Sequence, residues 1–337
     1  MRWLKFTRRA EGVFEFTSAA PGPRVTLVGG IHGNERIGVL VLDALRLALL
    51  GAAPLPLPLA STDSQNTAIS KRPPAVELSL ERGALTLVYG NPAALRLGTR
   101  GSSPHADLNR CFGVDVLSTD HHTHADDGYE QRRARELASI LAASDVMLDL
   151  HSTNAPAPPF VRVAGGGAAV PAALVRLAAR LPCDIMVHDP QFLLGGGRVA
   201  LTDEFVGAHG GLGLCFESGL ASDLSDANVR AILHGVLHVL QFDTQSIAPV
   251  LPREDAAARA DRAMTTFTVT QAFRLSDRGF QWADGVGARN FQRVAARAPI
   301  GFVGGEPFAV DYDAHVVFPK IPSLWKVGSY VLTQIAL

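Results

Sequence analysis

The feature that most constrains the fold is the alternation of strand-like and helix-like segments over the first 245 residues. Short apolar runs predict strands at 24–30, 85–92, 145–152 and 212–219. Segments with apolar residues at helical spacing predict helices at 36–50, 129–143, 171–181 and 226–242. Strands that alternate with helices favour a mostly parallel sheet with helices on both faces. The sequence therefore predicts an α/β fold.

The pattern changes after about residue 245. The stretch 249–264 is typical of a linker, and short strand-like runs separated by Gly and Pro follow it. We therefore expect a larger domain at 1–245 and a smaller β-rich domain at 262–337. Within the larger domain, the stretch 51–78 is rich in Pro, Ser and Ala and lacks periodicity, which predicts a surface insertion.

Composition and charge exclude several classes of protein. The chain is 47% hydrophobic and 19% charged, so it can bury a sizeable core. A formal net charge of −1 without a run of one sign argues against a nucleic-acid-binding protein. The longest apolar run is interrupted by Asp43 and Arg46, which favours a buried helix over a membrane span. The three cysteines fit no disulfide framework or zinc ribbon, and the N-terminus does not resemble a signal peptide, so we expect a cytoplasmic protein.

Polar residues with useful chemistry stand where the predicted strands end. They are His32 and Glu35 after the first strand, Asn91 after the second, Asp149 and His151 in the third, and Glu217 in the fourth. In an open α/β sheet, ligands bind beyond the carboxyl ends of the strands. A parallel sheet would therefore bring these side chains together.

Two imidazoles and a carboxylate, from His32, His151 and Glu35, match the ligand set of a catalytic zinc site. Glu217 follows an apolar strand, where desolvation raises the pKa of a carboxyl group into the range of a general base. Taken singly, each residue has a plainer interpretation, as a solvated loop residue, a core histidine or the partner of a buried arginine. Asp149 either supports a ligand histidine or accepts at a helix cap. Their coincidence at strand ends favours the metal site.

Two further segments contain candidate binding residues. Arg100, Asn109 and Arg110 lie in the segment 98–113, and an arginine fork with a neighbouring amide suits a substrate carboxylate. Without that context they would be surface residues of an arginine-rich chain. The second segment contains His121, His122 and His124, and we favour a solvated loop there over a metal site, because no strand or helix fixes the ring geometry.

With these residues assembled, the chain resembles the succinylglutamate desuccinylase and aspartoacylase family, zinc hydrolases with a carboxypeptidase-like fold. The matching motifs are "GGIHGNE", "GNPAAL", "DLNRCFG", "RARELASIL", "LDLHS" and "FESG", and "HVVFPKIPSLWKVGSYVL" is similar to the end of the bacterial desuccinylases. The resemblance implies a zinc-carboxypeptidase-like α/β fold, with a mixed, mostly parallel sheet, for a catalytic domain at 1–245.

The resemblance also implies individual roles. His32, Glu35 and His151 match the ligands of one Zn²⁺ per chain, and Glu217 matches the catalytic glutamate. Asn109 and Arg110 match the pair that binds a substrate carboxylate. Arg100 is the nearest match to an arginine that polarises the scissile carbonyl, although it lies two residues further upstream than the family pattern places that arginine. Arg198 is the nearest arginine to the position of a second carboxylate-binding arginine.

The function implied is removal of the acyl group from an N-acyl amino acid of the N-succinylglutamate or N-acetylaspartate type. The alternatives are a carboxypeptidase-like metallopeptidase and a non-catalytic protein that binds zinc or a small acid. The expected partner is a small molecule, with no nucleic acid or membrane, and assembly into a homo-oligomer stays open.

Overall fold

The computed structural model describes residues 5–55, 78–118, 127–252, 263–276, 278–325, 327–328 and 330–336. Most of the expected insertion at 51–78 and most of the expected linker lie outside the described residues. The histidines at 121, 122 and 124 lie outside them as well.

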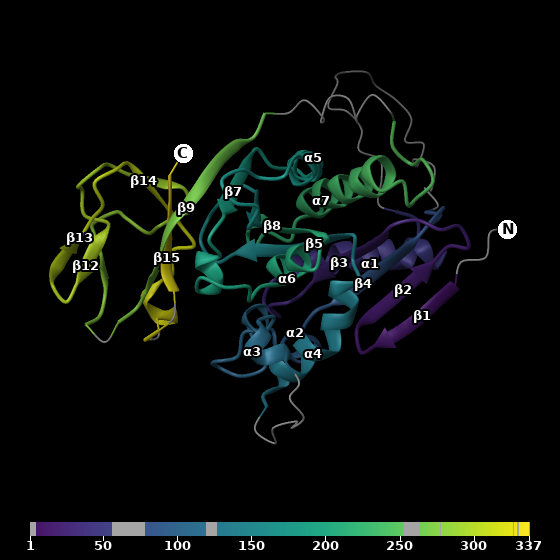
Figure 1. The fold of residues 1–337 in the computed structure, drawn as a ribbon, viewed down its shortest axis with the longest axis horizontal. Helices are drawn as coiled ribbons and strands as arrows, with labels where there is room; N and C mark the ends of the chain where they lie inside the picture. The colour runs from purple at the N-terminus through teal and green to yellow at the C-terminus, as the bar shows by residue number, and fades with distance from the viewer. Residues whose placement is uncertain are drawn as a thin grey trace.

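One large sheet runs through the described part of the molecule (Figure 1). Its strand order is β1 (Lys5–Ala10), β2 (Val13–Thr17), β4 (Ala84–Tyr89), β3 (Arg24–Gly29), β5 (Val146–Thr153), β8 (Leu212–Leu220), β6 (Phe160–Ala164), β7 (Ile185–Asp189), β9 (Thr265–Arg274), β15 (Tyr330–Ala336), β14 (Ala314–Val317) and β11 (Gln292–Val294). The central strands β4, β3, β5 and β8 pair in parallel, whereas β6 is antiparallel to β8. The predicted mostly parallel α/β fold is confirmed.

Helices cover both faces of the central sheet. The helices on one face are α1 (Ile37–Leu49), α5 (Ala172–Arg180) and α7 (Asp226–His238). The helices on the other face are α4 (Tyr129–Ala142) and α6 (Thr202–Ala208). The short helix α3 (Val114–Leu117) packs against α4, and the short helix α2 (Pro92–Leu97) follows β4 in the chain.

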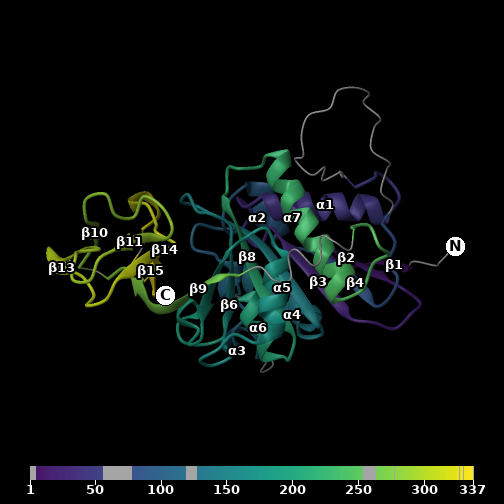
Figure 2. The same cartoon turned by 90° about the horizontal axis from the view of Figure 1, so that it is seen from above.

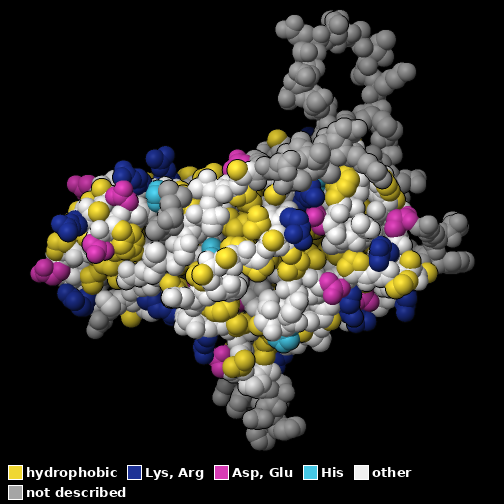
Figure 3. Space-filling view, turned by 45° about the horizontal axis from the view of Figure 1, so that its top comes forward, with side chains coloured by type: hydrophobic (Ala, Val, Ile, Leu, Met, Phe, Trp, Pro, Cys, Tyr) yellow, Lys and Arg dark blue, Asp and Glu magenta, His cyan; other side chains and the backbone are white. Residues whose placement is uncertain are grey.

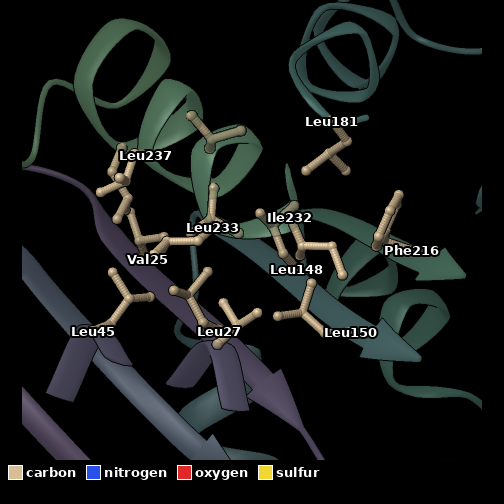
Figure 4. Close-up of a cluster of buried hydrophobic side chains, with 14 of the residues drawn as sticks. Val25, Leu27, Leu45, Leu148, Leu150, Leu181, Phe216, Ile232, Leu233 and Leu237 are labelled. Carbon is tan, nitrogen blue, oxygen red and sulfur yellow. The ribbon is translucent and has the colours of Figure 1, made fainter. Parts of the chain in front are cut away.

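Alternation along the strands divides the core between the two faces. Leu148 and Leu150 of β5 pack in the cluster beneath α1 and α7 with residues such as Leu45 and Leu233 (Figure 4). Met147 of the same strand packs on the opposite side, against α4 and α6. Because successive side chains of a strand point to opposite faces, Asp149 and His151 share the side of Met147. This alternation places them on the face that α6 covers.

The C-terminal part extends the sheet and has a hydrophobic cluster of its own. It lies to one side of the helix-covered part, and β9 leads into it (Figures 1 and 2). A separate small sheet there contains β10 (Gln281–Trp282), β12 (Gly301–Val303) and β13 (Glu306–Phe308), next to a cluster that includes Ile300 and Leu332. Since β9 pairs in parallel with β7, backbone hydrogen bonds join the two parts. The division into domains at 1–245 and 262–337 stays a prediction.

The sequence reasoning missed several elements of this fold. β1 and β2 form a hairpin at the sheet edge, β6 and β7 pair in parallel, and α6 packs on β5, β6 and β8. The pattern of short apolar runs separated by Gly and Pro is confirmed as strands in the C-terminal part.

The surface does not display a field of one charge on the face shown in Figure 3. Acidic and basic side chains are interspersed there among apolar and polar atoms, in agreement with the formal net charge of −1. Within the described residues, none of the helices has the length and apolar character needed to cross a membrane.

Candidate active site

Three parallel strands bring the predicted site residues to one edge of the sheet. Gly29 of β3 is in register with Leu150 of β5, and His151 of β5 is in register with Glu217 of β8. His32 and Glu35 lie in the loop that follows β3 directly. The carboxyl ends of these strands therefore assemble residues that are far apart in the sequence, as the sequence predicted.

The loop after β3 depends on its glycines. A Cβ atom at Gly29 would lie 2.7 Å from the carbonyl carbon of Gly38, so glycine allows α1 to pack closely on the strand. Gly30 has a φ of +71°, a left-handed conformation that L side chains rarely adopt. This tight turn directs His32 and Glu35 inward, where both side chains are buried.

The side chains of His32, Glu35 and His151 converge on one point. His32 Nδ1 lies 2.8 Å from Glu35 Oε1, and His151 Nδ1 lies 2.8 Å from Glu35 Oε2. One ligand atom from each of the three residues lies within 4.8 Å of the others. Because all three are buried and each offers a nitrogen or a carboxylate oxygen, the group can bind a divalent metal ion.

The outer nitrogen of each histidine also faces a carboxylate. His32 Nε2 lies 3.1 Å from Asp107 Oδ1, and His151 Nε2 lies 3.0 Å from Asp149 Oδ2. Metal-bound histidines usually present their second nitrogen to such an acceptor, which fixes the ring and its tautomer. Both rings direct Nδ1 towards the Glu35 carboxylate, so the three donor groups converge. The residues present therefore fit a metal centre.

The electrostatics of the cluster agree with this role. Burial raises the pKa of Glu35, but the neighbouring His32 and His151 lower it further, so the net shift is well below the ordinary value. Burial lowers the pKa of His151, but the carboxylates of Asp149 and Glu35 raise it well above the usual range. In the absence of a metal, the cluster thus balances a carboxylate against a protonated imidazole.

Glu217 lies beside this cluster with a different electrostatic character. Burial raises the pKa of Glu217 to about 8. The lowering effect of His151 opposes this shift, and the negative charge of Glu35 adds to it. Its Oε2 atom is buried without a hydrogen-bond partner among the described residues. A divalent cation bound next to it would lower this pKa, because opposite charge favours the carboxylate. Glu217 is thus a carboxyl group able to accept and return a proton near neutral pH.

The structure places Arg100, Asn109 and Arg110 in the same pocket, which has a volume of about 790 Å³ including the space open to solvent. Arg100 donates from Nε and Nη2 to Asp107 Oδ2 at 3.1 and 3.0 Å, and its Nη1 lies 3.7 Å from Glu35 Oε1. Asn109 and Arg110 belong to a short 3₁₀ turn, Leu108–Arg110.

Arg198 lies elsewhere. Its side chain is 63% exposed and forms an ion pair with Asp115 at 3.1 Å, and it is not among the residues that line the pocket. The arginine that lines the pocket instead is Arg162 of β6, which is almost fully buried. Asp203, Glu204 and Asp189 surround its guanidinium.

Sequence reasoning missed Arg162, although a signal was present. The residue interrupts the apolar run "FVRVA", and an arginine in a buried strand requires acidic partners. Those partners come from α6 and from the end of β7, which the sequence did not predict as elements.

Two other strand-end residues have structural contacts. Asn91 caps α2 by accepting from the backbone N–H of Ala94, and its side chain donates to Glu130, so it does not line the pocket. Asp149 Oδ2 lies 3.0 Å from His151 Nε2 and accepts from the hydroxyl of Thr202, the first residue of α6.

The C-terminal part supplies a wall of the pocket. Its pocket-lining residues are Asn290, Phe318, Pro319, Lys320 and Thr333. The amide of Asn290 donates to the carbonyl of Ala155 at 3.0 Å and accepts from the backbone N–H of Phe318 at 2.7 Å. One side chain thus connects the wall to the loop after β5.

Comparison with known proteins finds similar sequences and similar structures. Residues 76–242 match the model of the succinylglutamate desuccinylase/aspartoacylase catalytic domain. A probable aspartoacylase of Nostoc sp. is 30% identical over 137 residues, which are 39% of this chain and 36% of that protein. A succinylglutamate desuccinylase of Serratia proteamaculans is 34% identical over 143 residues, which are 42% of this chain and 32% of that protein. The matched regions thus span about a third of these relatives.

Among solved structures, succinylglutamate desuccinylase from Vibrio cholerae has a similar fold, with a TM-score of 0.67 and 16% sequence identity. The likeness covers 99% of this chain and 90% of that one. Matching segments, a shared fold and a catalytic-domain match that spans the third and fourth predicted strands lead to one assignment. Residues 76–242 belong to the succinylglutamate desuccinylase/aspartoacylase catalytic-domain family.

Proposed function

We propose that this protein is a zinc-dependent hydrolase that removes the acyl group from an N-acyl amino acid. The observation that carries the proposal is the convergence of His32, Glu35 and His151, with ligand atoms within 4.8 Å, beside a buried Glu217 in one pocket. A binding protein has no need of an ionisable carboxyl with a pKa of about 8 next to its metal ligands. The catalytic-domain match and the activities for which the similar proteins are named support this reaction class.

His32, Glu35 and His151 would hold the ion, which when bound acidifies water and polarises a carbonyl group. Glu217 takes the proton of the attacking water and passes it to the nitrogen of the leaving amine. The C–N bond of the amide breaks, one C–O bond forms, and the products are a carboxylic acid and a free amino acid. The carboxyl group of Glu217 is then returned to its starting form.

Two arginines and an asparagine complete the proposed site. Arg100 lies 3.7 Å from Glu35 and faces the same pocket, so it stabilises negative charge that develops on the carbonyl oxygen. Arg110 and the amide of Asn109 bind the carboxylate of the amino-acid half, because a guanidinium and an amide donor suit that anion. The dicarboxylic substrates N-succinylglutamate and N-acetylaspartate are the first candidates.

The proposal is tested by the release of free amino acid from a small set of compounds. The set contains N-succinylglutamate, N-succinylarginine, N-acetylaspartate, N-acetylglutamate and several N-acetyl aromatic amino acids. The protein is stripped of metal and assayed with Zn²⁺, without Zn²⁺ and with excess chelator. We expect Zn²⁺-dependent release from at least one compound, and the Glu217→Gln variant serves as the inactive control.

Two results would contradict the proposal. Cleavage of C-terminal residues from peptides, with no reaction of the acyl amino acids, would identify a metallopeptidase. Stoichiometric Zn²⁺ binding without hydrolysis of either class would identify a binding protein.

A further inference from the structure

The first residue of α6 contacts both halves of the proposed site. Thr202 is fully buried, and its hydroxyl donates to Asp149 Oδ2 at 2.5 Å. Its backbone N–H donates to Asn109 Oδ1 at 3.0 Å. One residue, outside the metal ligands and the pocket lining, thus supports a carboxylate behind His151 and an amide at the substrate side.

The contact with Asp149 leads to the metal ligands. The oxygen that accepts from Thr202, Asp149 Oδ2, lies 3.0 Å from His151 Nε2. His151 Nδ1 in turn points at Glu35, 2.8 Å away. The hydroxyl holds the carboxylate oxygen that forms a close ion pair with the imidazole. Loss of the hydroxyl therefore lets the carboxylate rotate away and weakens the electrostatic interaction that keeps the ligand ring in place.

The contact with Asn109 leads to the substrate side. Its amide has an oxygen that accepts and an NH₂ that donates, and the N–H of Thr202 fixes the oxygen end. Asn109 lines the pocket, and with its oxygen engaged by Thr202 the NH₂ remains as the group that can donate to a substrate carboxylate. A swivelled amide would present an acceptor to an anion.

Hydrogen bonds of Arg162 and Glu204 hold the start of α6 in place. Arg162 donates from Nη1 to both carboxylate oxygens of Asp203, at 2.9 and 2.7 Å, and from Nη2 to Glu204. Glu204 Oε2 also accepts from the backbone N–H groups of Ala200 and Leu201, at 2.8 and 3.0 Å. The residues on either side of Thr202 are therefore immobilised by buried ionic hydrogen bonds.

We infer that Thr202 is a positioning residue that serves the metal centre through its hydroxyl and the carboxylate-binding amide through its backbone N–H. The inference rests on the proposed function for the meaning of the Asn109 half. It makes metal affinity and substrate affinity separable, because two different atoms of one residue carry them.

Three substitutions separate the two atoms. Thr202→Ser keeps both donors. Thr202→Val keeps the shape and the N–H but removes the hydroxyl. Thr202→Pro removes both donors, and proline is tolerated at the first position of a helix. Leu201 has φ −101° and ψ 162°, an extended conformation compatible with a following proline.

The first readout is the Kd of Zn²⁺ for the metal-free protein, measured by competition with a chromogenic chelator and without any substrate. We expect a Kd raised about 10-fold or more in Thr202→Val and Thr202→Pro and near the wild-type value in Thr202→Ser. The second readout is KM at saturating Zn²⁺ for the best compound of the set. KM should rise several-fold in Thr202→Pro and stay within about twofold in Thr202→Val.

Thr26→Val is the matched control. Thr26 is a buried threonine of β3 whose hydroxyl lies 2.7 Å from that of Ser144, and neither residue lines the pocket. Its substitution should lower Tm but leave the Kd of Zn²⁺ and KM unchanged. If Thr202→Val lowers Tm as Thr26→Val does while the Kd of Zn²⁺ stays at the wild-type value, Thr202 is structural only and the inference is overturned. Since the Zn²⁺ arm needs no turnover, it decides the inference even where the proposed hydrolysis fails.

Discussion

His151 on β5 and Glu217 on β8 are register partners in two neighbouring parallel strands. The backbone hydrogen bonds of the sheet therefore fix how far the proposed general base lies from a proposed metal ligand. A base carried on a loop would vary in position, whereas this one is held by the core of the fold.

Glu217→Gln should abolish turnover but retain Zn²⁺. Glutamine has nearly the same shape and does not accept the proton of water at neutral pH, so kcat should fall by about 10²- to 10⁴-fold. Metal content is measured by atomic absorption and turnover by amino-acid release. Turnover near the wild-type level would exclude Glu217 as the base, and loss of Zn²⁺ would place it among the ligands.

The same substitution predicts a pH dependence of stability in the metal-free protein. Burial raises the folded-state pKa of Glu217 to about 8, above the ordinary value of 4.5. The protonated side chain therefore makes its full contribution to the free energy of unfolding below pH 4.5. This contribution is lost as the pH rises through 8. Glu217→Gln should match the wild type at pH 5 and exceed its stability by a few kcal/mol at pH 9, since one pKa unit is worth about 1.4 kcal/mol.

Chemical denaturation at several pH values measures this difference. Glu306, which is exposed on β13, provides the control, and Glu306→Gln should leave the pH profile unchanged. A gap between wild type and Glu217→Gln that is equal at pH 5 and pH 9 would contradict the raised pKa.

Removal of one proposed ligand should abolish stoichiometric Zn²⁺ binding. In His32→Ala the remaining donors, Glu35 and His151, are too few for a catalytic zinc site, which uses three protein ligands. Equilibrium dialysis against buffered Zn²⁺ measures the occupancy. His105→Ala, at an exposed histidine outside the cluster, should keep full occupancy, and full occupancy in His32→Ala would refute the ligand assignment.

The two arginines Arg162 and Arg198 should differ sharply in their effect on stability. Arg162→Met leaves three buried carboxylates without their cation, which typically costs about 3–5 kcal/mol. Arg198→Met breaks an exposed ion pair with Asp115, worth about 0–1 kcal/mol. Urea denaturation of the two variants measures both effects. Equal losses would mean that Arg162 has no buried ionic role.

Arg110 should determine substrate affinity. Arg110→Ala removes a charged donor to the proposed carboxylate, worth about 1.5–3 kcal/mol, so KM should rise by about 10- to 100-fold. Steady-state kinetics at saturating Zn²⁺ measure this change. Arg198→Ala should leave KM unchanged because Arg198 lies outside the pocket. An unchanged KM in Arg110→Ala would assign the carboxylate to another cation of the pocket.

The sequence was sufficient for features that depend on local pattern. The periods of apolar residues predict β3, α1, β5, β8 and α7, because burial on one face imposes those periods. The sequence places His32, Glu35, His151 and Glu217 at strand ends. Parallel pairing aligns the carboxyl ends of the strands at one edge of the sheet, and this brings the four residues together.

Tertiary structure alone decided the features that depend on contacts across the chain. Arg162 meets Asp203 and Glu204 only because β6 lies antiparallel to β8 and beneath α6, and no spacing in the sequence records that pairing. The same holds for Thr202, which reaches Asn109, a residue 93 positions earlier. Residue types and periods determine which groups are available, but the burial and partner of each group are set by the packing of elements, and this packing decides its orientation and charge.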